Sequence, residues 1–156
     1  MLQVTLQRIV SGGQTGVDRA ALDAAMECGV PVGGWCPKGR RAEDGPIPAR
    51  YPLTETPTER YAQRTAWNVR DSDGTLILHQ DPLTGGTALT QQEAEQRGRP
   101  WRVVTLGTSR PTKNALQWLH THSIEVLNVA GPRASEEPGI YAAALAFVKS
   151  ICEQAT

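Results

Sequence analysis

The sequence has few cysteines, no excess of either charge and no long apolar run, and each absence excludes a class of protein. Its three cysteines, Cys28, Cys36 and Cys152, are odd in number and form no C-x-x-C pair, so we expect no disulfide framework. Sixteen basic and sixteen acidic side chains cancel, which gives no overall attraction to nucleic acid or to an anionic membrane. No apolar run approaches the roughly 20 residues of a membrane span, and the N-terminus lacks the features of a secretory signal. We therefore expect a cytoplasmic protein that binds neither nucleic acid nor membrane.

What the sequence does contain is an alternation of short apolar runs with longer amphipathic segments. The strands expected from the apolar runs are Arg8–Val10, Pro31–Gly33, Thr75–Leu78, Arg102–Leu106 and Ile124–Val129. The third and fourth runs are almost entirely aliphatic, which is typical of strands covered on both faces. Alternating strands and helices predict an α/β fold with a mostly parallel sheet of five strands or slightly more. A chain of 156 residues is long enough for one domain, residues 1–156, and too short for two.

Capping signals mark where helices are expected to begin. Residues 15–18, 56–59 and 90–93 each place a Thr three positions before an acidic residue, which is the pattern of a capping box. A last helix is expected from about residue 140 to 153, with apolar residues at helical spacing. One stretch, residues 35–56, shows no such pattern and is long for a compact domain. Such a stretch is typical of a lid, a binding loop or a partner surface.

Three glycine-rich turns follow predicted strands, at residues 12–16 (GGQTG), 83–87 (LTGGT) and 130–135 (AGPRAS). Because the carboxyl ends of parallel strands meet at one edge of a sheet, we expect these turns to lie together. Each precedes a helix, whose unpaired amides and dipole favour an anion. Glycine also lets a phosphate approach the main chain closely. Any one of these turns could be only a tight connection, but three at one edge favour an anion-binding site.

The first turn matches neither of the two common phosphate-binding motifs. It lacks the Lys and the hydroxyl residue that end a P-loop. No acid stands about 20 residues beyond it, as a dinucleotide-binding fingerprint requires. ATP hydrolysis and ordinary NAD-dependent hydride transfer therefore lose support. His120 and His122 face different ways on a helix and have no third ligand nearby in sequence, so no metal site is expected.

The long stretch could cover a ligand. It contains Trp35 and Lys38 ahead of two acids, Glu43 and Asp44. The tryptophan could stack on a ring while the cations face a phosphate, although a solvated surface loop fits the same residues. Further on, Arg64 shares a helix face with Asn68. For that pair an ordinary surface face or a buried ion pair is the favoured interpretation.

Several motifs together resemble a known family. They are residues 11–18 (SGGQTGVD), 34–39 (GWCPKG), 43–48 (EDGPIP), 73–75 (DGT), 84–87 (TGGT) and 131–133 (GPR). Over almost its whole length the chain resembles the proteins named as molybdenum-cofactor carriers. These are also described as a circularly permuted YpsA-like branch of the SLOG superfamily, relatives of the LOG proteins. The resemblance implies a three-layer Rossmann-like domain that forms homo-oligomers, dimers or tetramers, and binds molybdenum cofactor or a nucleotide derivative.

The leading hypothesis is a binding protein for a phosphorylated small molecule, with no catalytic residues. The residues expected to bind the ligand are Gly12, Gly13, Gln14, Thr15, Gly16, Asp18, Trp35, Lys38, Gly85, Gly86, Thr87, Gly131, Arg133 and Ser135. One alternative is a nucleotide-processing hydrolase, similar to LOG phosphoribohydrolases. Its candidate acids and bases are Asp18, Glu43, Asp44 and Asp73, but Thr90 stands where those relatives carry their catalytic Glu. The other alternative is a regulatory protein that senses a nucleotide.

Overall fold

The computed structural model describes residues 4–80, 86–108 and 110–155. Within them, five strands form one sheet in the order β2-β1-β7-β5-β6. Their bounds are Arg8–Val10 for β1, Val32–Gly33 for β2, Gly74–His79 for β5, Trp101–Thr105 for β6 and Val126–Ala130 for β7. Every pairing between neighbours is parallel. The predicted α/β fold with a parallel five-stranded sheet is confirmed.

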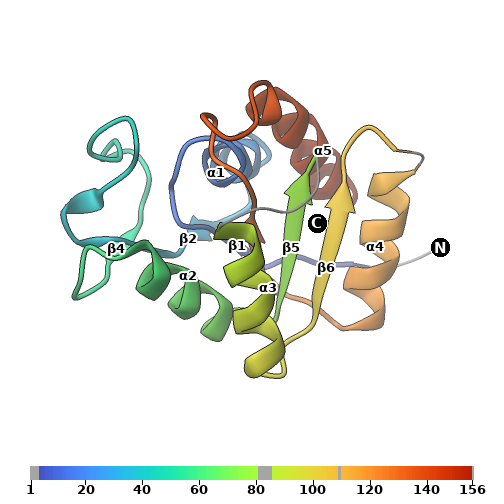
Figure 1. Ribbon diagram of the computed structural model, residues 1–156. Helices are drawn as coiled ribbons and strands as arrows, with labels where there is room; N and C mark the ends of the chain where they lie inside the picture. Colours follow the sequence, from blue (N-terminus) through green and yellow to red (C-terminus); the bar gives the residue numbers. More distant parts are fainter. Residues whose placement is uncertain (1–3, 81–85, 109, 156) are drawn as a thin grey trace.

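Helices cover both faces of the sheet and make the predicted three layers (Figure 1). The helices of the described residues are α1 Val17–Glu27, α2 Tyr61–Arg70, α3 Gly86–Gln96, α4 Pro111–Thr121 and α5 Ile140–Gln154. The main apolar core lies between the sheet and helices α1, α4 and α5, which cover one of its faces. Helices α2 and α3 pack together on the opposite face. None of these helices combines the length and the apolar character needed to cross a membrane.

Two helices begin at positions other than the predicted capping boxes. Helix α2 starts at Tyr61 rather than at Pro57. The N–H and the hydroxyl of Thr58 both donate to the side chain of Gln63, at 2.9 and 2.6 Å, which forms a separate turn ahead of the helix. Thr90 lies inside α3, not at its start. The capping pattern is therefore present in the sequence but is used at neither site.

The two aliphatic strands have different surroundings. Strand β5 is buried at every position, as expected for a central strand covered on both faces. Strand β6 was expected to be covered on both faces, and this prediction is wrong. Most of its positions are partly or fully exposed, because it lies at the edge of the sheet and pairs only with β5. An aliphatic run therefore does not by itself separate a central strand from an edge strand.

The stretch expected to be irregular is ordered. It contains β3 (Trp35–Cys36), a short 3-10 turn (Lys38–Arg40) and β4 (Thr54–Glu55), and the two strands pair in parallel as a separate small sheet. We call residues 37–53 the long loop. Arg40 lies at its centre and donates hydrogen bonds to the carbonyl oxygens of Ile47, Pro48 and Tyr51, at 2.8–2.9 Å. The loop therefore has its own internal framework.

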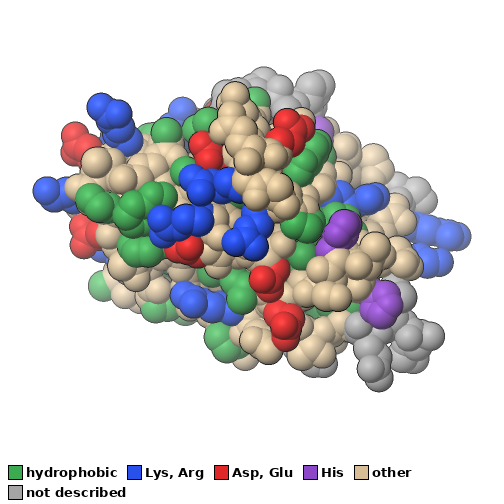
Figure 2. Space-filling view, turned by 90° about the horizontal axis from the view of Figure 1, so that it is seen from below, with side chains coloured by type: hydrophobic (Ala, Val, Ile, Leu, Met, Phe, Trp, Pro, Cys, Tyr) green, Lys and Arg blue, Asp and Glu red, His purple; other side chains and the backbone are tan. Residues whose placement is uncertain are grey.

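Two features, a charged surface and a contact between the first and last described segments, lie away from the edge at which the strands end. Figure 2 shows the molecule from below, the edge at which β5 and β6 begin, where Lys and Arg side chains gather with Asp and Glu among them. Where α2 leads into β5, Arg70 and Asp71 form an ion pair at 2.8 Å. The first and last described segments also meet, because the N–H of Leu6 donates to the carbonyl oxygen of Ala155 at 2.8 Å.

Candidate functional site

A cavity of about 120 Å³ lies where β1 and β7 end. Its other walls come from α2 and α3. The polar side chains lining it include those of Gln14, Asp18, Arg64, Asn68, Thr90, Asn128, Arg133 and Glu136. The helix that follows β5 lies on one face of the sheet, and the helix that follows β7 lies on the other. Such a reversal leaves a crevice at the carboxyl ends of the strands, which is where open α/β sheets bind ligands.

Arg64, from α2, is the buried cation of this cavity. Its Nη1 donates to the carbonyl oxygen of Gly12 at 3.0 Å and lies 3.6 Å from the Asp18 carboxylate. Both charged side chains are 10% exposed. Among the described residues, none accepts a hydrogen bond from Nε or Nη2 of Arg64. A guanidinium has five N–H groups, so several remain available to a ligand.

The absence of a side chain at Gly12 leaves room for the Arg64 side chain. A β-carbon at this position would lie 2.3 Å from Nη1 and 2.4 Å from Cδ of Arg64. The open side of the main chain, which the sequence suggested would admit a phosphate, is therefore covered by the guanidinium. Any anion at this point would meet the Arg64 side chain.

Asp18 is the one candidate acid or base of the hydrolase alternative that lines the cavity. Burial raises the pKa of its carboxyl group, while Arg64 and the hydrogen bond from the Gln14 N–H oppose that rise. Asp44 is held by Arg19 at 2.6 Å. Asp73 instead accepts main-chain N–H groups at the start of β7, the opposite edge of the sheet. Of these candidates only Asp18 could serve a hydrolytic mechanism in this cavity, and Glu136 is a further carboxylate in its lining.

The glycines of the first and third turns serve close packing of the main chain. A β-carbon at Gly13 would lie 2.6 Å from Leu53 of the long loop. At Gly16 it would lie 2.4 Å from the carbonyl oxygen of Pro132. At Gly131, which also lines the cavity, it would lie 2.4 Å from the carbonyl oxygen of Leu78. The two turns therefore contact each other and leave no open glycine cradle between them.

The second turn can be placed only in part. Gly85 lies outside the described residues. Gly86 begins α3, and Thr87 is buried in the first turn of that helix. Thr90, one turn further along α3, lines the cavity.

Trp35 and Lys38 do not line the cavity. The main-chain N–H of Trp35 donates to Asn68 at 2.8 Å, and its indole N–H donates to Asp71 at 2.8 Å. Its ring also meets that of Trp67 edge to face, with centroids 4.8 Å apart. Lys38 is exposed at the start of the 3-10 turn. The Trp35 ring is thus fixed against α2 and is not placed to stack on a ligand in this cavity.

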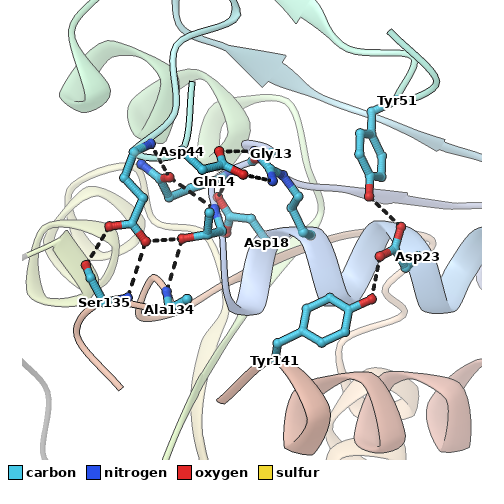
Figure 3. Close-up of polar contacts among 12 residues, drawn as sticks. Gly13, Gln14, Asp18, Asp23, Asp44, Tyr51, Ala134, Ser135 and Tyr141 are labelled. Atoms are coloured by element: carbon cyan, nitrogen blue, oxygen red, sulfur yellow. Dashed lines mark hydrogen bonds and ion pairs between the residues drawn. The ribbon is translucent and has the colours of Figure 1, made fainter. Parts of the chain in front are cut away.

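Glu43, from the long loop, occupies the point where the first and third turns meet. Its carboxylate accepts hydrogen bonds from the Thr15 hydroxyl, from the Ser135 hydroxyl at 2.5 Å and from the Ser135 N–H at 3.2 Å (Figure 3). Nε of Arg133 lies 4.0 Å away. The bonds from Ser135 and Thr15 lower the pKa of Glu43. We call Thr15, Arg133 and Ser135 the anion seat, since they already bind an anion that the protein itself supplies.

Gln14 links the anion seat to the cavity. Its side-chain oxygen Oε1 accepts the N–H of Thr15 at 3.0 Å and the N–H of Glu43 at 2.9 Å. The same residue lines the cavity. Thr15 itself does not cap α1, whose N-cap is Gly16, and its hydroxyl serves the anion seat instead.

Two further contacts hold the long loop against α1 (Figure 3). Arg19 binds both carboxylate oxygens of Asp44, at 2.6 and 2.8 Å. Asp23 accepts hydrogen bonds from the hydroxyls of Tyr51 in the loop and Tyr141 in α5, at 2.7 and 2.5 Å. The loop is therefore fixed at several separate points.

The contacts of Asp23 predict a loss of stability at high pH. Burial, followed by the hydrogen bond to Asp23, raises the pKa of Tyr51 to about 12, and the same causes raise that of Tyr141 to about 12. Because both folded values exceed the ordinary 10.0, this stabilisation is complete below pH 10 and is lost as pH rises towards 12. We expect the free energy of unfolding to fall across that window in urea titrations. Asp23→Asn should lower both pKa values, followed by tyrosinate absorbance; ordinary titration of both tyrosines in the unchanged protein would refute the assignment.

Sequence reasoning missed most of the cavity wall. For Arg64 and Asn68 a surface face or a buried ion pair was favoured over a binding role, and Asn128 was not singled out. Asn128 is buried in β7, where Nδ2 donates to Thr75 at 3.2 Å and no described residue donates to Oδ1. The signal that could have found it is a lone amide near the carboxyl end of an apolar strand, VLNVA.

Comparison with known proteins places the chain in a family. The profile of the circularly permutated YpsA SLOG family matches residues 9–152. A 1.45 Å crystal structure described as "Putative molybdenum carrier protein", from Syntrophus aciditrophicus SB, is 45% identical, with 96% of each chain covered and a TM-score of 0.93. No curated protein matches the chain. The two matches agree with the motifs and the fold, and we conclude that the chain belongs to the circularly permutated YpsA SLOG family.

Proposed function

We propose that this protein binds a phosphate-bearing small molecule in the cavity between α2, α3 and the ends of β1 and β7. The observation that carries the proposal is Arg64, a buried guanidinium that lines the cavity and uses only Nη1 within the described residues. Guanidinium groups match the oxygens of phosphate in a planar, two-point arrangement. Arg64 can therefore bind a phosphate while the Asp18 carboxylate remains beside the guanidinium as its counter-charge.

The remaining lining supports a ligand with a polar ring. Oδ1 of Asn128 offers an acceptor, and ring N–H groups of a pterin or a nucleobase are suitable donors. A cavity of about 120 Å³ is smaller than the roughly 300–1,000 Å³ of sites that enclose a whole small molecule. The described residues therefore enclose one end of the ligand. Molybdenum cofactor and nucleotide derivatives both combine a phosphate with such a ring, and the similar protein described as a molybdenum carrier favours the former.

The donor set fits the organic part of such a ligand. Arg64 would hold the phosphate, and Asn128 would meet a ring N–H. In residues 4–80, 86–108 and 110–155 no three His, Cys, Asp or Glu side chains are grouped to hold a metal ion.

Ligand binding is expected to stabilise the fold measurably. At a hundredfold excess over Kd, a ligand that binds only the folded state raises the free energy of unfolding by about 2.7 kcal/mol. We expect this effect from molybdopterin or from nucleoside monophosphates, and not from their dephosphorylated forms, in urea unfolding with each compound. Equal stabilisation by phosphorylated and dephosphorylated forms would refute recognition of the phosphate. Mass spectrometry of any compound that co-purifies with the protein would identify the ligand.

The same samples test the enzymatic alternative. Thr90, which stands where the hydrolytic relatives carry a Glu, lines the cavity and supplies no carboxylate. We therefore expect chromatography to recover each nucleotide unchanged. Release of a free base would favour the hydrolase over the binding protein.

A further inference from the structure

We propose that the anion seat is a second binding site for an oxyanion of the ligand, and that Glu43 is an internal occupant which the ligand displaces. The inference deepens the proposed function, because the seat adjoins the cavity. It assigns Glu43 as a residue that weakens binding of anions at the seat. A ligand that fills both sites would carry two oxyanion groups, as diphosphate esters do.

Two of the three residues of the seat, Thr15 and Arg133, are also held by contacts other than those with Glu43. The hydroxyl oxygen of Thr15 accepts the N–H of Ala134 at 3.1 Å, which leaves its proton free to point at an anion. Ser135 offers both its N–H and its hydroxyl from the same turn. Arg133 adds a guanidinium and is itself held by Glu136 at 3.4 Å. Hydrogen bonds to an ionised acceptor are roughly twice as strong as neutral ones, so this arrangement suits a phosphate oxygen as well as a carboxylate.

Glu43 can leave the seat without unfolding the long loop. Its side chain is 22% exposed, so solvent already reaches it. Its main-chain N–H is bound by Gln14, and the next residue, Asp44, is bound by Arg19. Rotation of the Glu43 side chain alone would therefore vacate the seat while these contacts keep the main chain in place.

The seat and the cavity share a boundary. Arg133 lines the cavity and also lies beside the Glu43 carboxylate, and Gln14 contacts both regions. A ligand whose first phosphate lies at Arg64 can thus extend a second one past Arg133. The Glu43 carboxylate opposes that second phosphate by occupying its donors and by like-charge repulsion.

Inorganic phosphate is the probe for this proposal. We expect Glu43→Ala to bind phosphate at least about tenfold more tightly than the unchanged protein in calorimetry, since a seat that is free one-tenth of the time binds tenfold more weakly. Glu43→Gln, which keeps the length of the side chain, should show a gain in the same direction. Circular dichroism establishes that both variants are folded.

Two control variants decide the outcome. Asp44→Asn removes the neighbouring carboxylate and loosens the loop, yet it leaves Glu43 in the seat, so we expect no gain. Adding Ser135→Ala to Glu43→Ala removes the hydroxyl donor of the seat and should reverse most of the gain. No gain in Glu43→Ala, an equal gain in Asp44→Asn, or a gain that survives Ser135→Ala would each overturn the inference. None of these outcomes tests whether ligands in the cavity stabilise the fold, so the proposed function is tested by a separate experiment.

Discussion

Replacing Arg64 with alanine is expected to abolish ligand binding in the cavity and to lower the free energy of unfolding by roughly 3–5 kcal/mol. The stability loss follows because Asp18 would remain buried without its counter-charge; the two groups lie 3.6 Å apart and both are 10% exposed. Calorimetry with a phosphorylated ligand measures the loss of binding, and urea unfolding measures the loss of stability. The expected loss is a large share of the roughly 5–15 kcal/mol typical of a domain.

A second substitution separates the two effects. Adding Asp18→Asn to Arg64→Ala removes the uncompensated carboxylate, so stability should recover in part while ligand binding stays lost. Arg64→Lys keeps the charge and loses the planar fork, so it should fold well and bind phosphate weakly. Full affinity for the phosphorylated ligand in Arg64→Ala would show that Arg64 does not bind it and that the phosphate is not held at this point of the cavity.

Gly16→Ala is expected to lower the free energy of unfolding by roughly 2–6 kcal/mol. Gly16 has φ +78°, and its added β-carbon would lie 2.4 Å from the carbonyl oxygen of Pro132 and 2.9 Å from the N–H nitrogen of Ala134. With ψ −127°, Gly16 lies outside the left-handed helical region, in a positive-φ region that costs about 1–3 kcal/mol for an alanine. Overpacking adds about 1–3 kcal/mol, because both neighbours are main-chain atoms that cannot move aside easily. Denaturant unfolding gives the value directly.

Gly29 provides a comparison without a steric contact. It also has a positive φ, +75°, but nothing lies within 4 Å of an added β-carbon. Gly29→Ala should therefore show only the cost of the backbone conformation, about 1–2 kcal/mol. We expect a larger loss in Gly16→Ala, because its added β-carbon also meets the main chain of the third turn. Equal losses would show that this steric contact has no effect on stability.

Much of the fold could be predicted because its signals are local. The apolar runs mark the strands, and the last helix begins at Ile140 as expected, since hydrophobic periodicity is a property of neighbouring residues. The start of α2 could not be predicted in this way. Thr56, the residue expected to cap the helix, instead donates its hydroxyl to the carbonyl oxygen of Thr58, and Thr58 donates to Gln63.

The site was harder because its pairs join distant parts of the sequence. Arg64 meets Asp18 only after α2 has packed over the end of β1, and no local pattern encodes that contact. The Thr15, Arg133 and Ser135 side chains were expected to hold an anion, and in the structure they hold Glu43. Binding of an external ligand by these residues stays a prediction, as does the expected homo-oligomer.

The contact between Leu6 and Ala155 has a consequence for the history of such chains. Because these two residues are adjacent, a short connecting peptide could turn the polypeptide into a ring, and the ring could be cut at an exposed bend elsewhere. The order in which a ribosome makes the strands would change, while every neighbour of Arg64 would stay where it is. Rearranged genes can therefore encode the same binding cavity.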